Sequence, residues 1–82
     1  MWGRRTTFER MARNPRNNWT IKDVERVCQE NGLTCSAPRG GGSHYKVSGH
    51  GTTLTIPARR PIKPVYIKAL VGLIIKIRDE TK

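Results

Sequence analysis

Hydrophobic side chains recur at helical spacing in two stretches of the chain. The first lies between Thr20 and Asn31 and follows the three- and four-residue intervals of a helix with one buried stripe, formed by Ile21, Val24, Val27 and Cys28. Thr20 and Asp23 match a capping box, and Trp19 is placed to pack on Val24. The second begins at Pro64, a residue suited to the first helical position, and repeats through Ile67, Leu70, Val71, Ile74 and Ile77. The pattern predicts two amphipathic helices, with a frayed tail over residues 79–82.

Between these helices the hydrophobic period falls to two, which is typical of strands with one buried face. The alternation predicts a short strand over residues 33–37 and a hairpin over residues 44–48 and 52–56, turning at Gly49-His50-Gly51. The hairpin side chains expected to face the core are Tyr45, Val47, Leu54 and Ile56. Side chains at the alternate positions of the two strands are then expected on the exposed face of the sheet: His44, Lys46, Thr53 and Thr55.

Residues 1–18 form a basic N-terminal segment with five arginines and one acid. Thr6 and Glu9 match a capping box, which predicts a short helix over Thr7–Arg13 with Phe8 and Met11 on one face. A mobile basic arm is the alternative. We therefore divide the chain into this arm and a single domain over residues 19–82. The order of elements predicts an α+β fold, an α-β-β-β-α sandwich like that of double-stranded-RNA-binding domains, with two helices on one face of a three-stranded antiparallel sheet.

Composition narrows the class of protein. The chain has 82 residues and a net charge of +10, which fits one small domain with a polyanionic partner: nucleic acid, an acidic protein or an anionic membrane surface. The longest apolar run, residues 69–75, is too short to span a bilayer, and no apolar stretch follows the first arginines as in an export signal. We expect a cytoplasmic protein, not bound to membranes, whose two cysteines are reduced.

The residues with candidate chemistry are Arg39-Gly40-Gly41-Gly42-Ser43-His44. Glycines before a strand let backbone N–H groups approach a phosphate, and imidazole, with an ordinary pKa of about 6.5, moves protons at neutral pH. The alternative to a catalytic role is that His44 is an ordinary surface histidine beside a hairpin loop. Acidic residues are absent from this loop, and the spacing of the cysteines and histidines is unlike that of zinc fingers. We expect no metal and no cofactor.

The chain resembles the HicA family of toxin ribonucleases. The matching features are Arg10 to Asn17, Trp19-Thr20 with Asp23, Gly32, the Gly42-Ser43-His44 signature, Ile56-Pro57, Lys63-Pro64 and Tyr66. Gly40 and Gly41 depart from the family, in which a glutamine or arginine often precedes the signature. The resemblance implies the double-stranded-RNA-binding-like fold, a metal-independent endoribonuclease that cleaves mRNA with His44 as its catalytic residue, and a HicB-type antitoxin that holds it inactive.

Several further residues are candidates for binding RNA or phosphate. Lys46, on the same face as His44, is the candidate for stabilising charge on the phosphorus, with Gly42 and Ser43 as hydrogen-bond donors. Arg39, Arg59 and Arg60 supply further positive charge for the backbone of the nucleic acid. Two other functions stay open: a non-catalytic RNA-binding module of the same fold, and a structural protein that binds an acidic partner.

Overall fold

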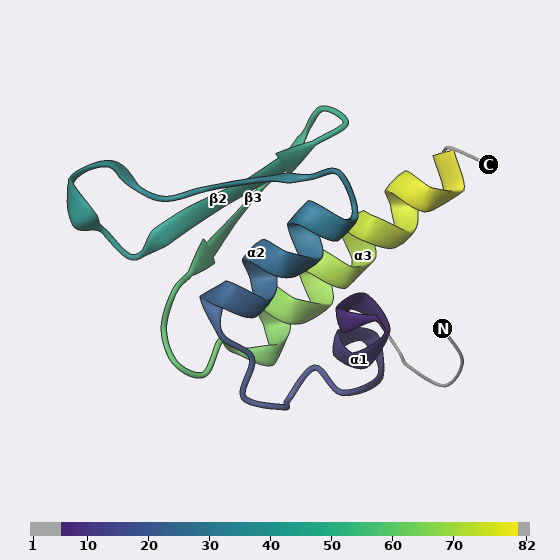
Figure 1. The fold of residues 1–82 in the computed structure, drawn as a ribbon, viewed down its shortest axis with the longest axis horizontal. Coiled ribbons are helices and arrows are strands. Elements are labelled where there is room, and N and C mark those ends of the chain that lie inside the picture. Colours follow the sequence, from purple (N-terminus) through teal and green to yellow (C-terminus); the bar gives the residue numbers. More distant parts are fainter. Residues whose placement is uncertain (1–5, 81–82) are drawn as a thin grey trace.

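The computed structural model describes residues 6–80, which form a helical layer on one face of a three-stranded antiparallel sheet (Figure 1). The elements in chain order are α1 (Thr7–Arg13), α2 (Ile21–Glu30), β1 (Thr34–Ser36), the 3-10 turn η1 (Arg39–Gly41), β2 (His44–Gly49), β3 (Thr52–Pro57) and α3 (Pro64–Glu80). The sheet order is β1-β2-β3. The predicted α+β fold is confirmed. Within residues 6–80, no helix is long and apolar enough to cross a membrane.

Both N-terminal helices begin at the capping boxes predicted for them. The hydroxyl of Thr6 accepts the Glu9 N–H at 3.2 Å, and the Glu9 carboxylate accepts the Thr6 N–H at 2.9 Å. Thr20 and Asp23 repeat this exchange at the start of α2, at 3.4 and 2.9 Å. Such reciprocal bonds satisfy two backbone donors that the helix itself leaves unpaired, which is why the two starts could be located from the sequence.

Helix α1 is part of the folded core, so the predicted short helix over residues 7–13 is confirmed. Phe8 and Met11 on its inner face are buried, and Met11 has no exposed surface. Figure 1 shows α1 packed beside α3. Helices α2 and α3 contact the sheet, as predicted, and α1 packs against both of these helices. Residues 1–5 of the predicted arm lie outside the described part of the chain.

The last turn of α3 is longer than predicted, because the helix continues through Asp79 to Glu80. Arg78 donates two hydrogen bonds to the side-chain oxygen of Asn31, at 2.8 and 3.3 Å, and its guanidinium lies 4.2 Å from the centre of the Phe8 ring. Ile77 beside it is buried. These contacts join the ends of all three helices and explain why a segment that looks like a polar tail is helical.

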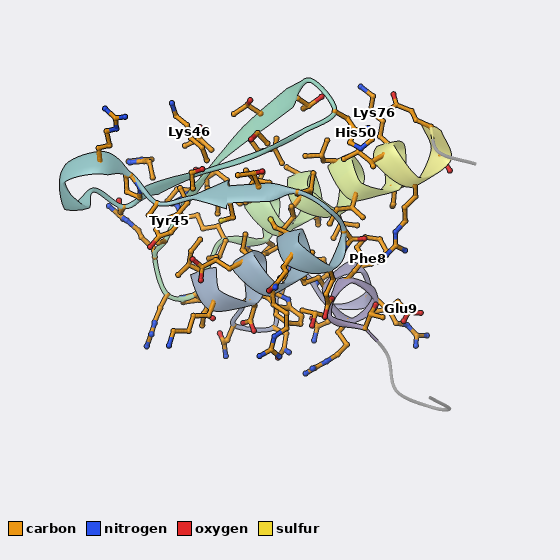
Figure 2. The ribbon with its side chains drawn as sticks, turned by 45° about the horizontal axis from the view of Figure 1, so that its top comes forward. Phe8, Glu9, Tyr45, Lys46, His50 and Lys76 are labelled. Atoms are coloured by element: carbon orange, nitrogen blue, oxygen red, sulfur yellow. The ribbon has the colours of Figure 1, made fainter. Side chains whose placement is uncertain are left out.

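The register of the sheet separates a buried face from an open one. Cys35, Val47 and Leu54 pair across the three strands on the side of the helices. Ser36, Lys46 and Thr55 pair on the opposite side and are exposed. In Figure 2, Tyr45 points toward the helical layer while Lys46 points away from it. The predicted assignment of the hairpin side chains is therefore confirmed.

The set of α3 residues that is buried differs slightly from the set predicted from helical spacing. Leu73 is buried where Val71 is only half-buried, because α3 contacts the sheet on one side and α1 on the other.

Cys28 and Cys35 are free thiols on adjacent elements, α2 and β1. Burial, together with the neighbouring Cys35 thiol, raises the pKa of Cys28 from 9.0 to about 12. Burial also raises the pKa of Cys35. The folded protein therefore holds its Cys28 proton at a pH where the unfolded chain has lost it.

We expect this difference to weaken the fold in alkali. Between about pH 9 and pH 12 the unfolded state binds fewer protons than the folded state, so the free energy of unfolding falls as pH rises; below about pH 9 the stabilisation is complete. Urea denaturation of wild type and Cys28→Ala across this pH range measures the free energy of unfolding of each protein and checks this prediction. The stability gap between the two proteins should narrow with rising pH, and a gap that stays constant contradicts the assignment.

Candidate active site

His44 is the first residue of β2 and pairs with Pro57 at the end of β3. Its side chain is exposed, as predicted, at the edge of the open sheet face that also carries Lys46. One residue earlier, the Ser43 carbonyl accepts a hydrogen bond from the Ala58 N–H at 2.6 Å. This bond extends the pairing of the two strands and fixes the backbone next to His44 to the start of the loop that follows β3.

A hollow of about 220 Å³ opens on one side of His44. Its walls come from the start of β2, the end of β3, the following loop and the first turn of α3, with the residues Ser43, His44, Pro57, Arg59, Lys63 and Tyr66. We call it the Tyr66 pocket. It brings one imidazole, one phenol and two cationic side chains to the same space.

A second hollow, of about 390 Å³, lies on the other side of His44. It is formed by the end of β1, the segment leading into η1, the first residue of η1 and the start of β2, with the residues Ser36, Ala37, Pro38, Arg39, His44 and Lys46. We call it the Lys46 pocket. His44 lines both hollows, and none of the described residues that line them is acidic. An anionic chain laid across both therefore meets positive charge on either side of the imidazole.

The loop that carries Arg59 and Lys63 is held by the core. Ile62 is buried, and its N–H donates to the Trp19 carbonyl at 2.9 Å. The Lys63 carbonyl then accepts the Tyr66 N–H at 3.0 Å, which starts α3. These bonds set the direction in which the loop meets the helix. They place Lys63 and Tyr66, which are three residues apart, on the wall facing His44.

The structure gathers most of the predicted site residues around His44 but divides them between the two pockets. Ser43 and Arg59 line the Tyr66 pocket, whereas Arg39 and Lys46 line the Lys46 pocket. Gly42 is exposed immediately before Ser43. Arg60 lines neither hollow; it lies with Asn18, Thr20 and Pro61 around another depression.

Sequence reasoning did not assign Lys63 and Tyr66 to the site. Both were noted as matches to the HicA family, but nothing in the local pattern ties the start of the last helix to the start of β2. The available signal was a basic residue directly before Pro64 and a tyrosine in the first turn, a polar tip on an otherwise apolar helix. Only the path of the loop over Trp19 shows that this turn faces His44.

The side chains of the Tyr66 pocket are free to engage a ligand. Within the described chain, neither the His44 imidazole nor the Tyr66 hydroxyl has a hydrogen-bond partner. An imidazole and a phenol can each carry a proton, and two cations can stabilise an oxyanion. Across residues 6–80, three or more potential metal ligands do not gather at any point. The arrangement suits acid–base chemistry on a phosphodiester.

No model of a protein family, curated protein or solved structure matches the chain.

Proposed function

We propose that this protein is a toxin of the HicA type: a cytoplasmic, metal-independent endoribonuclease that cleaves mRNA and is neutralised by a HicB-type antitoxin. The observation that carries the proposal is the position of His44, exposed at the junction of two cation-lined hollows. The Gly42-Ser43-His44 resemblance supports it independently. Cleavage of mRNA would slow translation and growth until the antitoxin covers the site.

RNA supplies its own nucleophile, so the protein needs only to move two protons and stabilise charge. His44 takes the proton from the 2′-hydroxyl, whose oxygen attacks the adjacent phosphorus. The bond from phosphorus to the 5′-oxygen breaks, and Tyr66 donates its proton to that leaving oxygen. The products are a 2′,3′-cyclic phosphate and a 5′-hydroxyl. Arg59 and Lys63 stabilise the charge that develops on the phosphoryl oxygens.

The Lys46 pocket serves in this proposal as the binding site for the neighbouring nucleotide. Lys46 was first considered as the group that stabilises the phosphorus. Its place with Arg39, on the far side of His44 from Arg59 and Lys63, favours a role in holding the backbone instead. A lysine that holds a phosphate equally well in the ground and transition states affects KM rather than kcat.

The proposal is tested by incubating the purified protein with an unstructured RNA in EDTA. We expect cleavage with cyclic phosphate ends, no cleavage of the same sequence as DNA, and growth arrest on expression that the antitoxin gene relieves. Tight binding of RNA without products would support the non-catalytic binding module instead. Products with 5′-phosphate ends, or activity that requires added magnesium, would contradict the proposed chemistry.

Two substitutions separate the roles of the two pockets. Tyr66→Phe keeps the ring and removes the proton, so we expect kcat to fall by about 10²-fold with KM nearly unchanged. Lys46→Ala is expected to raise KM by about fivefold and leave kcat nearly unchanged, because an exposed ion pair contributes at most about 1 kcal/mol. Steady-state kinetics on one short RNA measures both. A fall in kcat for Lys46→Ala together with a rise in KM for Tyr66→Phe would exchange the roles assigned to the two residues.

A further inference from the structure

An apolar hollow of about 210 Å³ lies in the helical layer, between the end of α1 and the middle of α3. It is lined by Ala12, Pro15, Lys68, Val71, Gly72 and Ile75, of which only Lys68 is charged. None of these residues lines the Tyr66 pocket or the Lys46 pocket. A dry cavity of about 150 Å³ can hold a benzene molecule, so this hollow has room for a large aliphatic or aromatic side chain.

Exposed hydrophobic residues extend the hollow along α3. Ile75 is 47% exposed and Val65 is 63% exposed, and both belong to this helix. Val65, Lys68, Gly72 and Ile75 follow one another at intervals of three and four, so they share one face. A single exposed hydrophobic residue is ordinary, but here Ile75 lines the apolar hollow and Val65 continues the same face. We call this surface the α1–α3 groove.

Gly72 is an independent sign that something approaches this face. It occupies the interior of α3, where glycine destabilises a helix relative to alanine. A Cβ atom at position 72 would meet no atom of this chain within 4 Å. The packing of this protein against itself therefore does not require glycine here. A bare backbone in the floor of an apolar groove allows a partner to pack directly against the helix.

The charges around the groove select the kind of partner. Lys68 lies in the groove, and α3 carries no acidic residue before Asp79. Arg13 and Arg16, on either side of the turn that contributes Pro15, are exposed. A second copy of this chain would bring the same cations together on a protein of net charge +10, which opposes association. An acidic partner meets complementary charge.

We propose that the α1–α3 groove binds an acidic amphipathic helix of a partner protein. Its apolar side chains fill the hollow and lie over Gly72, and its carboxylates face Lys68. This inference is independent of ribonuclease activity, because the groove shares no lining residue with the two pockets at His44. A partner bound here leaves the open face of the sheet available to RNA.

The probe is a fluorescein-labelled synthetic peptide of about 15 residues, long enough for about four helical turns, with leucine on one face and glutamate on the other. A peptide of the same composition in scrambled order is the control for charge alone. We expect the amphipathic peptide to bind at least about tenfold more tightly in fluorescence anisotropy. In NMR spectra of the ¹⁵N-labelled protein, the amide shifts should centre on residues 68–76 and on Ala12.

Two variants test the groove itself. Gly72→Leu fills the hollow and should retain the fold, because open space surrounds that position. Ile75→Lys removes apolar surface and adds positive charge. We expect each to weaken binding at least about tenfold. Lys22→Ala, an exposed lysine on α2, is the matched control and should change affinity less than about twofold.

Several outcomes would overturn the proposal. Unchanged or tighter binding to Ile75→Lys would show that the peptide is held by charge alone. Amide shifts centred on His44 and Lys46 would place it on the face assigned to RNA. A concentration-dependent dimer that Gly72→Leu disperses would assign the groove to a second copy. Binding to anionic vesicles that Ile75→Lys abolishes, with no peptide binding by wild type, would assign it to a membrane.

Discussion

Replacing His44 with alanine is expected to lower the rate of RNA cleavage by about 10²- to 10⁴-fold, the usual contribution of a general acid or base. The affinity for RNA should stay within about threefold. Both expectations follow from the position of the residue: its side chain is exposed at the first position of β2 and supports no other part of the described chain. The imidazole can therefore be removed without a cavity and without disturbing the cationic walls of either pocket.

Single-turnover cleavage measures the first effect, and anisotropy with an RNA that carries a 2′-deoxynucleotide at the cleavage site measures the second. His50→Asn is the matched control, because His50 is the other histidine and lies in the β2–β3 turn, where asparagine tolerates its positive φ of 49°. It should cleave like wild type. Undiminished cleavage by His44→Ala would remove this residue from the mechanism.

Replacing Trp19 with alanine is expected to lower the free energy of unfolding by about 3–5 kcal/mol, as for other buried aromatic residues. Trp19 is only 4% exposed. Its indole N–H donates to the Asn14 carbonyl at 2.7 Å, and the Arg10 guanidinium lies 5.8 Å from the ring centre. The same burial excludes the ring from stacking on RNA bases. Because small domains are stable by about 5–15 kcal/mol, this substitution leaves little margin.

Trp19→Phe separates the ring from its hydrogen bond. It retains most of the buried apolar surface and loses only the indole donor, so we expect a loss of about 1–2 kcal/mol. Urea denaturation followed by circular dichroism compares the variants. Trp19→Ala should also lower cleavage under conditions where it is folded, since the Trp19 backbone anchors Ile62 in the loop that carries Arg59 and Lys63. Equal stability of the two variants would contradict this account.

Local signals were sufficient for most of the fold. The capping residues Thr6 and Thr20 located two helix starts, and Pro64 located the third, because each acts on the backbone within its own turn. Alternation along the hairpin placed Tyr45 and Lys46 on opposite faces of the sheet. The last turn of α3 escaped prediction because Arg78 stabilises it through Asn31, 47 residues earlier in the chain.

The candidate site was predictable only in part for the same reason. His44 and Lys46 could be placed on an exposed face because period-two alternation within one strand determines the side on which a residue lies. Lys63 and Tyr66 reach His44 through the loop that Ile62 attaches to Trp19, a contact between segments more than forty residues apart. The division of the cations between two pockets follows from that path and has no counterpart in the local pattern.

The backbone differs between the two flanks of His44. On the β3 side, the bond between Ser43 and Ala58 holds the backbone in place before any ligand arrives. On the η1 side, Gly40 and Gly41 have φ angles of +75° and +81°, with open space where side chains would lie. Under the proposed function, the RNA backbone would therefore meet a flank held by strand pairing on the β3 side and a flank of bare backbone, open to close approach, on the η1 side.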